Sequence, residues 1–102
     1  MVYEKLSVYY PVQTCIKKRK NGDFLIVMND KEDIFYLNDV AQFVYEHCTG
    51  DISIEGIRQM IFSEYEHETT DDGAITEDLV NIIRDFQWQN IIELRRLRNE
   101  RV

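Results

Sequence analysis

Residues 12 to 37 read VQTCIKKRKNGDFLIVMNDKEDIFYL, a stretch that predicts most of a β-sheet. Its first part, residues 12 to 20, starts with alternating apolar and polar side chains, which is typical of a strand. Asn21-Gly22 follows at once, and because both residues tolerate a positive φ, the pair predicts a type I′ hairpin turn. Two further strand-like runs, residues 23 to 28 and 33 to 37, are separated by a polar turn. The stretch therefore predicts a three-stranded antiparallel meander.

The middle strand of this meander is apolar at five successive positions, Phe24 to Met28. We expect it to be buried on both faces, with helices over one face and the two ends of the chain over the other. The two outer strands are then the edges of the sheet. The first carries the cations Lys17 to Lys20, which disfavour pairing with another strand. The edge formed by Asp33 to Leu37 is apolar and unprotected.

Two helices are predicted directly after the strands. Asn38 or Asp39 is a good N-cap for a helix that ends near Cys48, because short polar side chains accept hydrogen bonds from the first free amides. Ser53 caps a second helix, in which apolar residues recur at helical spacing. The Thr-Gly-Asp sequence between the two helices predicts the break.

A third helix is predicted to open at Thr76, after a polar loop over residues 67 to 73. The basic tail, residues 93 to 102, either extends this helix or frays. The chain of 102 residues is long enough for one modest core, so we expect a single domain whose core spans about residues 10 to 92. The predicted class is α+β: a three-stranded antiparallel sheet followed by three helices, in a winged-helix-like arrangement.

Charge is distributed unevenly along the chain, which has a net charge of −7. Nine of the twelve basic residues lie in two short stretches, Lys5 to Lys20 and Arg95 to Arg101. Residues 21 to 94 hold only three basic residues against seventeen acidic ones. Such an acidic body repels a phosphate backbone, so nucleic-acid binding is disfavoured.

No sequence motif points to catalysis. The chain has no nucleophile elbow, P-loop, GxGxxG, CxxC or HExxH, and its two histidines fall on different predicted elements. His47 is expected to pack on a helix face, and the acidic residues 64 to 72 follow no calcium-loop spacing and are expected to be solvated. Cys15 and Cys48 are expected to be small core residues. We therefore expect a protein without enzyme activity, cofactor or metal.

Since no segment is apolar enough for a membrane span or a signal peptide, we expect a cytoplasmic location and no membrane partner.

The unprotected edge at Asp33 to Leu37 leaves three interpretations open. An extended peptide could add as a further strand there, a second copy of the chain could pair with it, or its aromatic residues could merely complete the sheet. The alternative from another class is a winged-helix nucleic-acid-binding regulator. Its reading helix would offer Arg84 as its only cation between Ile75 and Ile92, which argues against phosphate contacts.

Four segments together resemble a known family. Residues 35 to 44, FYLNDVAQFV, are similar to its LN-x-x-A-x-x-(I/F) signature, and residues 48 to 53, CTGDIS, resemble its helix junction. Residues 57 to 65 and 75 to 83 look like its second and third helices. This is the pattern of the PqqD-like proteins, which are peptide-binding modules called RiPP recognition elements, and the resemblance covers about residues 10 to 92.

The resemblance implies a standalone peptide chaperone with no chemistry of its own. Such proteins bind the leader segment of a ribosomally made precursor peptide as an added strand and present it to a modifying enzyme, often a radical SAM enzyme, which here would be a separate protein. Asn90 stands where the family has a helix-ending Gly, and it can adopt the same left-handed conformation. Carried over by position, the peptide-binding residues are Asp33, Ile34, Phe35, Tyr36 and Leu37 on the strand and Leu79, Ile82, Ile83, Phe86 and Gln87 on the helix.

Overall fold

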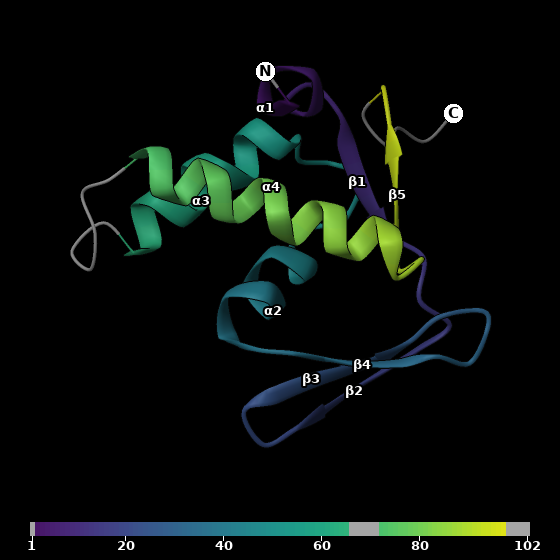
Figure 1. The fold of residues 1–102 in the computed structure, drawn as a ribbon. Helices are drawn as coiled ribbons and strands as arrows, with labels where there is room; N and C mark the ends of the chain where they lie inside the picture. The colour runs from purple at the N-terminus through teal and green to yellow at the C-terminus, as the bar shows by residue number, and fades with distance from the viewer. Residues whose placement is uncertain (1, 66–71, 98–102) are drawn as a thin grey trace.

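The computed structural model describes residues 2 to 65 and 72 to 97, and these form a mixed α+β fold (Figure 1). The elements follow one another as α1 (Val2–Leu6), β1 (Tyr10–Gln13), β2 (Lys17–Asn21), β3 (Phe24–Met28), β4 (Ile34–Leu37), α2 (Asp39–Glu46), α3 (Ile54–Tyr65), α4 (Asp72–Trp88) and β5 (Ile92–Arg95). The predicted α+β class is confirmed, and so is the antiparallel sheet β2-β3-β4 followed by three helices. A short helix and a second sheet, β1-β5, were not predicted.

The hairpin between β2 and β3 differs from the predicted turn by one residue. Asn21 pairs with Phe24, so the two turn residues are Gly22 and Asp23. Gly22 has a φ of 61° and, of the two, it alone has a positive φ. This is the pattern of a type II′ turn, in which only the first central residue needs the left-handed region. The predicted type I′ turn centred on Asn21-Gly22 is therefore wrong, although the hairpin itself is confirmed.

The predicted strand over residues 12 to 20 is in fact two strands in two sheets. β1 leaves the meander and pairs antiparallel with β5, with Val12 opposite Glu93. The backbone N–H of Thr14 also donates to the carbonyl of Ile91, at 2.9 Å. The expectation that the tail from residue 93 either extends the last helix or frays is thus wrong for residues 93 to 95, which lie in β5. Residues 98 to 102 of that tail lie outside the described residues.

Burial alternates along β3, so the prediction that both faces are covered is wrong. Leu25 and Val27 are buried at 7% and 0% exposure, whereas on the opposite face Phe24 is 47% exposed and Ile26 and Met28 are half-buried. Near the two ends of the described chain, β1 and β5 pair with each other in a separate sheet. A strand with one buried and one open face is the usual situation in an antiparallel sheet.

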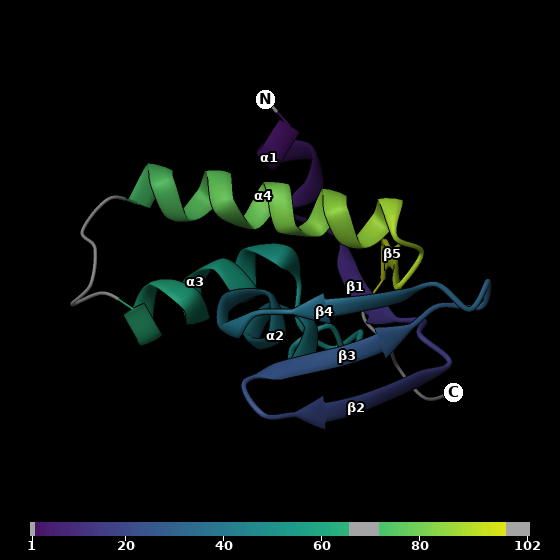
Figure 2. The same cartoon turned by 60° about the horizontal axis from the view of Figure 1, so that its bottom comes forward.

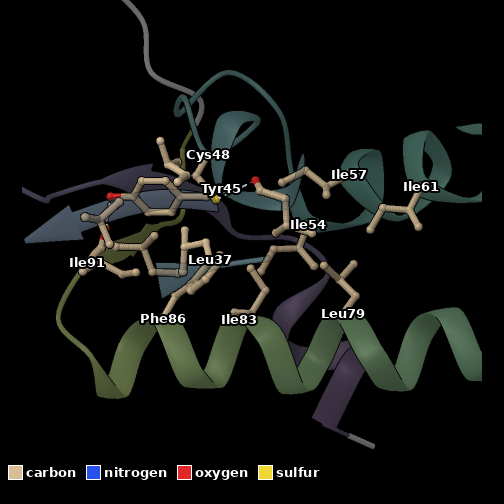
Figure 3. Packing of buried hydrophobic residues seen from close by; sticks show 14 of the residues in the cluster. Leu37, Tyr45, Cys48, Ile54, Ile57, Ile61, Leu79, Ile83, Phe86 and Ile91 are labelled. Carbon is tan, nitrogen blue, oxygen red and sulfur yellow. Dashed lines mark hydrogen bonds between the residues drawn. The ribbon is translucent and has the colours of Figure 1, made fainter. Parts of the chain in front are cut away.

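The core lies between the inner face of the sheet and the helices (Figure 3). Side chains from α4 point toward Leu37 and toward the residues of α3. Tyr45 of α2 is fully buried, and its hydroxyl donates to the carbonyl of Ile91 at 2.8 Å. The members of the core are Leu25, Val27, Leu37, Val44, Tyr45, Cys48, Ile54, Ile57, Ile61, Ile75, Leu79, Ile83, Phe86, Ile91 and Ile92.

The predicted helix starts agree with the structure for two of the three helices. Asn38 is the N-cap of α2, where its side chain accepts from the N–H of Ala41 at 3.1 Å. The Ser53 hydroxyl accepts from the N–H of Gly56 at 3.1 Å, directly before α3. α4 begins at Asp72, which is earlier than the predicted start at Thr76. Most of the predicted loop over residues 67 to 73 lies outside the described residues.

Polar side chains around Glu55 connect α1 to α3. The Tyr3 hydroxyl donates to the Glu55 carboxylate, and Arg58 forms an ion pair with it at 2.9 Å. Hydrogen bonds from Arg58 and then from Tyr3 stabilise the ionised form and lower the pKa of Glu55 from 4.5 to about 2. Burial, followed by the contact with Glu55, raises the pKa of Tyr3 to about 12.

The lowered pKa of Glu55 predicts an acid-sensitive contribution to stability. A carboxyl group with a depressed folded-state pKa stabilises the fold above its ordinary pKa, and this contribution is lost as the pH falls through the folded value. For Glu55 the window runs from about pH 4.5 down to about pH 2. We expect Glu55→Gln to show a smaller loss of stability across this window than the wild type in denaturant unfolding at several pH values. Equal losses in both proteins would contradict the assignment.

Candidate functional site

β4 is an edge strand with one side free. The sheet order is β2-β3-β4, so β4 pairs only with β3. The N–H of Asn29 donates to the carbonyl of Asp33 at 3.0 Å. Because hydrogen-bonded and non-hydrogen-bonded pairs alternate in an antiparallel ladder, Phe35 then faces β3 with its backbone groups, whereas Ile34 and Tyr36 face away. Within residues 2 to 65 and 72 to 97, these outward amides and carbonyls pair with no other strand.

β4 is the strand of its sheet that lies nearest to α4 (Figure 2). Between the start of β4 and the C-terminal end of α4 the surface is hollowed into a cavity of about 500 Å³. This volume is within the roughly 300 to 1,000 Å³ that ligand pockets in proteins occupy. The cavity is lined by Asn29, Lys31, Asp33, Phe35, Gln87, Trp88, Gln89 and Asn90.

Asn29 connects the two walls of this cavity. It is 1% exposed, and its side-chain amide donates to the Gln89 carbonyl at 2.8 Å. Its Oδ1 accepts from the backbone N–H groups of Lys31 and Asp33, at 2.9 and 3.0 Å. One buried amide therefore holds the turn between β3 and β4 and also ties that turn to the end of α4. The distance between the free edge and the helix is fixed at this end by Asn29.

The helix wall of the cavity is shaped by the way α4 ends. The N–H of Ile91 donates to the Phe86 carbonyl and that of Asn90 to the Gln87 carbonyl, both at 3.1 Å. Asn90 has a φ of 56°, which confirms the left-handed conformation predicted for it. Together these features are a Schellman motif. It ends the helix after Trp88 and turns the chain toward β5.

The ten residues predicted to bind peptide lie in three different environments. Asp33, Phe35 and Gln87 line the cavity. Ile34 and Tyr36 are 56% and 65% exposed on the outer face of the sheet. The other five belong to the core or pack against it: Leu37, Leu79, Ile82, Ile83 and Phe86.

Four lining residues lie outside the predicted peptide site and are not the predicted helix cap Asn90: Asn29, Lys31, Trp88 and Gln89. Asn29 and Lys31 fall in the predicted polar turn between the second and third strands. The sequence does hold one signal for Trp88, because it is the only tryptophan and directly follows the predicted position Gln87. Its exposed fraction of 88% is far above that of a tryptophan with a packing role.

His47 and the two cysteines pack against other parts of the fold. His47 is half-buried at the end of α2, where its Nδ1 lies 2.7 Å from the Phe43 carbonyl. Cys48 is buried, and burial raises the pKa of its thiol to about 12. Cys15 is half-buried and packs against the core, so the expectation that both cysteines are core residues is confirmed for Cys48 only.

The described part of the chain contains no group of three or more His, Cys, Asp or Glu side chains placed to bind a metal ion together. Residues 66 to 71, which include most of the acidic stretch, lie outside the described residues. None of the helices described has the length and apolar character that crossing a bilayer requires.

The other edge of the sheet, β2, is strongly basic. All five of its residues are exposed. The ammonium groups of Lys18 and Lys20 donate to the neutral side chains of Gln13 and Gln42, each at 2.7 Å. No ion pair joins a β2 cation to a carboxylate of the described residues. The two edges thus offer different surfaces, one basic and one with exposed Ile34 and Tyr36.

Comparison of the chain with protein-family models, with curated proteins and with solved structures gave no match.

Proposed function

We propose that this chain is a cytoplasmic, non-catalytic peptide-binding protein of the PqqD-like type. It binds the leader segment of a ribosomally made precursor peptide as an added strand on β4 and presents the rest of the precursor to a separate modifying enzyme, such as a radical SAM enzyme. The observation that supports this proposal best is the free edge of β4, where the backbone groups of Ile34 and Tyr36 point away from β3. Main-chain pairing at such an edge is a common mode of peptide recognition.

Backbone pairing alone gives such a complex little affinity. Each new hydrogen bond contributes about 0.5 to 1.5 kcal/mol. Fixing each peptide residue costs about 1 to 2 kcal/mol. These terms nearly cancel, so apolar side chains of the peptide, worth about 1.5 to 3 kcal/mol each when buried, must supply most of the affinity. The cavity beside β4 provides a place for one of them, since Phe35 and Trp88 both line it.

The proposal is tested by a proline scan of the free edge. A phage-displayed library of random short peptides is selected on the wild type, and the recovered peptides are synthesised and titrated against variants. Tyr36→Pro removes an outward N–H and leaves the β3 ladder intact, so we expect affinity to fall at least tenfold, because proline cannot donate to an added strand. Thermal unfolding checks that the variant is folded.

The matched control is Tyr36→Ala, which keeps the N–H and removes the exposed ring. It should retain the part of the affinity that comes from backbone pairing. Recovery of no peptide from the library, or recovery only of peptides that bind Tyr36→Pro as tightly as the wild type, would contradict strand addition at β4. Sedimentation velocity over a range of concentrations tests the related possibility that a second copy of the chain occupies the same edge.

Nucleic-acid binding by a winged-helix-like fold is the second candidate, and the exposed cations of β2 are the observation that favours it. The charge of the possible reading helix argues against it, because Arg84 is the only basic residue of α4. The salt dependence of the binding affinity distinguishes the two proposals. Phosphate contacts weaken by orders of magnitude between about 50 and 200 mM salt. Peptide affinity that rests on main-chain pairing and apolar burial should change far less over the same range.

A further inference from the structure

We infer that two copies of this chain pair through the outer edge of β5, so that their two-stranded sheets join into one four-stranded sheet, β1-β5-β5-β1. The two β5 strands run antiparallel about a two-fold axis at Leu94, and Glu93 of each copy lies opposite Arg95 of the other. This inference goes beyond the proposed function, because it concerns a different strand edge and a different partner.

The outer edge of β5 carries backbone groups that point away from the sheet. On the other side of β1, the Gln13 N–H and the Pro11 carbonyl bond to residues 48 to 50, at 3.0 and 2.9 Å. These two β1 residues therefore turn their backbone groups away from β5, and so their partners Ile92 and Leu94 turn theirs away from β1. In the part of the chain that the structure describes, no strand pairs with this side of β5, which lies on the outer side of β1 (Figure 1).

Three described strands have an open side, and they differ in how they suit pairing with themselves. β2 reads KKRKN, so antiparallel pairing of two copies would set cation against cation. β4 reads IFYL and carries no charge that could select a register. β5 reads IELR, in which a carboxylate and a guanidinium alternate with apolar residues. Since opposite charges directly across from each other stabilise a strand pair and like charges destabilise it, β5 is the edge that complements itself.

Charge also selects one register for the β5 pair. The outward groups of Ile92 and Leu94 can meet their counterparts when the two-fold axis passes through residue 93, 94 or 95. An axis at Glu93 sets two carboxylates directly opposite each other, and an axis at Arg95 does the same with two guanidinium groups. An axis at Leu94 sets each Glu93 opposite an Arg95, and the two Leu94 residues exchange backbone hydrogen bonds. The Leu94 register is therefore the favourable one.

The charged side chains are already arranged for this contact. Within one chain the Arg95 Nε donates to the Glu93 carboxylate at 2.8 Å, and both side chains are about half exposed, at 45% and 50%. A guanidinium group has five N–H donors, so each Arg95 can bond to its own Glu93 and to that of the second copy. Four charges of alternating sign then form a row across the interface. The contact between two short strands is small, so we expect a weak dimer that dissociates as salt rises.

The test exchanges the two charges and measures self-association by sedimentation equilibrium over a series of protein concentrations. In Glu93→Arg and in Arg95→Glu, residues 93 and 95 carry the same sign, so like charges meet across the axis. We expect the dissociation constant of the dimer to rise about tenfold or more in each variant at low salt. An equal mixture of the two variants should restore association close to the wild-type level, because each arginine of one variant then lies opposite a glutamate of the other.

The backbone bonds are tested at the two-fold axis. Leu94→Pro removes an outward N–H that the β1 ladder does not use, so we expect it to abolish the dimer. Leu94→Ala is the matched control, because it loses the same side-chain packing and keeps the N–H. It should therefore associate more strongly than Leu94→Pro. Thermal unfolding checks that both variants are folded.

The outcomes also separate this inference from the proposed function. A wild type that stays monomeric at every concentration would overturn the β5 dimer, as would charge variants whose mixture associates no better than either alone. A dimer that is lost in Tyr36→Pro but kept in Leu94→Pro would place the second copy on β4 and would overturn it as well. Peptide titration tests the proposed function independently, since Leu94→Pro should bind library peptides as tightly as the wild type does.

Discussion

Replacing Phe86 with alanine is expected to lower the free energy of unfolding by about 3 to 5 kcal/mol, because the truncation leaves a cavity in a closely packed core. Phe86 is 2% exposed, and its ring meets that of Tyr45 edge-on at 5.3 Å between centroids. Its carbonyl also accepts the N–H of Ile91 in the motif that ends α4. Chemical denaturation measures the change, and the midpoint should move with little change in the slope.

The control for Phe86→Ala is Trp88→Ala, two residues further along the same helix. Because Trp88 is 88% exposed, its removal should change the free energy of unfolding by no more than about 0.5 kcal/mol. The position of Phe86 in the predicted peptide site gives the experiment a second use. A Phe86→Ala protein with unchanged stability but much weaker peptide binding would show that this side chain faces the groove instead of the core.

Asn29→Ala is expected to lower the free energy of unfolding by about 2 to 3 kcal/mol, since removing a buried hydrogen-bonding side chain leaves its partners unsatisfied. The substitution removes the acceptor of two amides in the turn before β4 and the donor to the Gln89 carbonyl. Because Asn29 also fixes the position of β4 relative to α4, peptide affinity should fall together with stability. Denaturant unfolding and peptide titration measure the two effects.

Asn29→Asp separates the two roles of this side chain. An aspartate can still accept from the amides of Lys31 and Asp33, but it cannot donate to Gln89, so the link to α4 is lost. It also places a second carboxylate beside that of Asp33, which now accepts from the Asn29 amide at 3.4 Å, so the loss of stability should include repulsion between the two. Asn38→Ala is the comparison for an exposed cap, with an expected cost of about 1 kcal/mol and no effect on peptide binding. If Asn29→Ala cost no more than Asn38→Ala, the link between hairpin and helix would be structurally unimportant.

Local patterns in the sequence predicted the elements whose signals are local. The caps Asn38 and Ser53 and the apolar run of β4 each involve residues close together in the chain, and the structure contains the corresponding elements. Residues 12 to 20 carry no local signal for the break between β1 and β2. That break depends on pairing with β5, which lies almost at the other end of the described chain.

The prediction of the candidate site is incomplete for a similar reason. Helical periodicity identifies the apolar face of α4, but it does not show which residues of that face meet the core and which meet the cavity. Phe86 and Gln87 are neighbours in sequence, and only Gln87 lines the cavity. Nothing in the sequence distinguishes Asn29 from other polar turn residues, because its burial results from the packing of the hairpin against the end of α4.

The pairing of β1 with β5 has a consequence for synthesis on the ribosome. Residues 10 to 13 leave the exit tunnel early, but their partners, residues 92 to 95, are among the last described residues to be translated. Contacts between distant parts of a chain must wait until the intervening segment is present. The two-stranded sheet therefore cannot close on a nascent chain until residues 92 to 95 have left the exit tunnel.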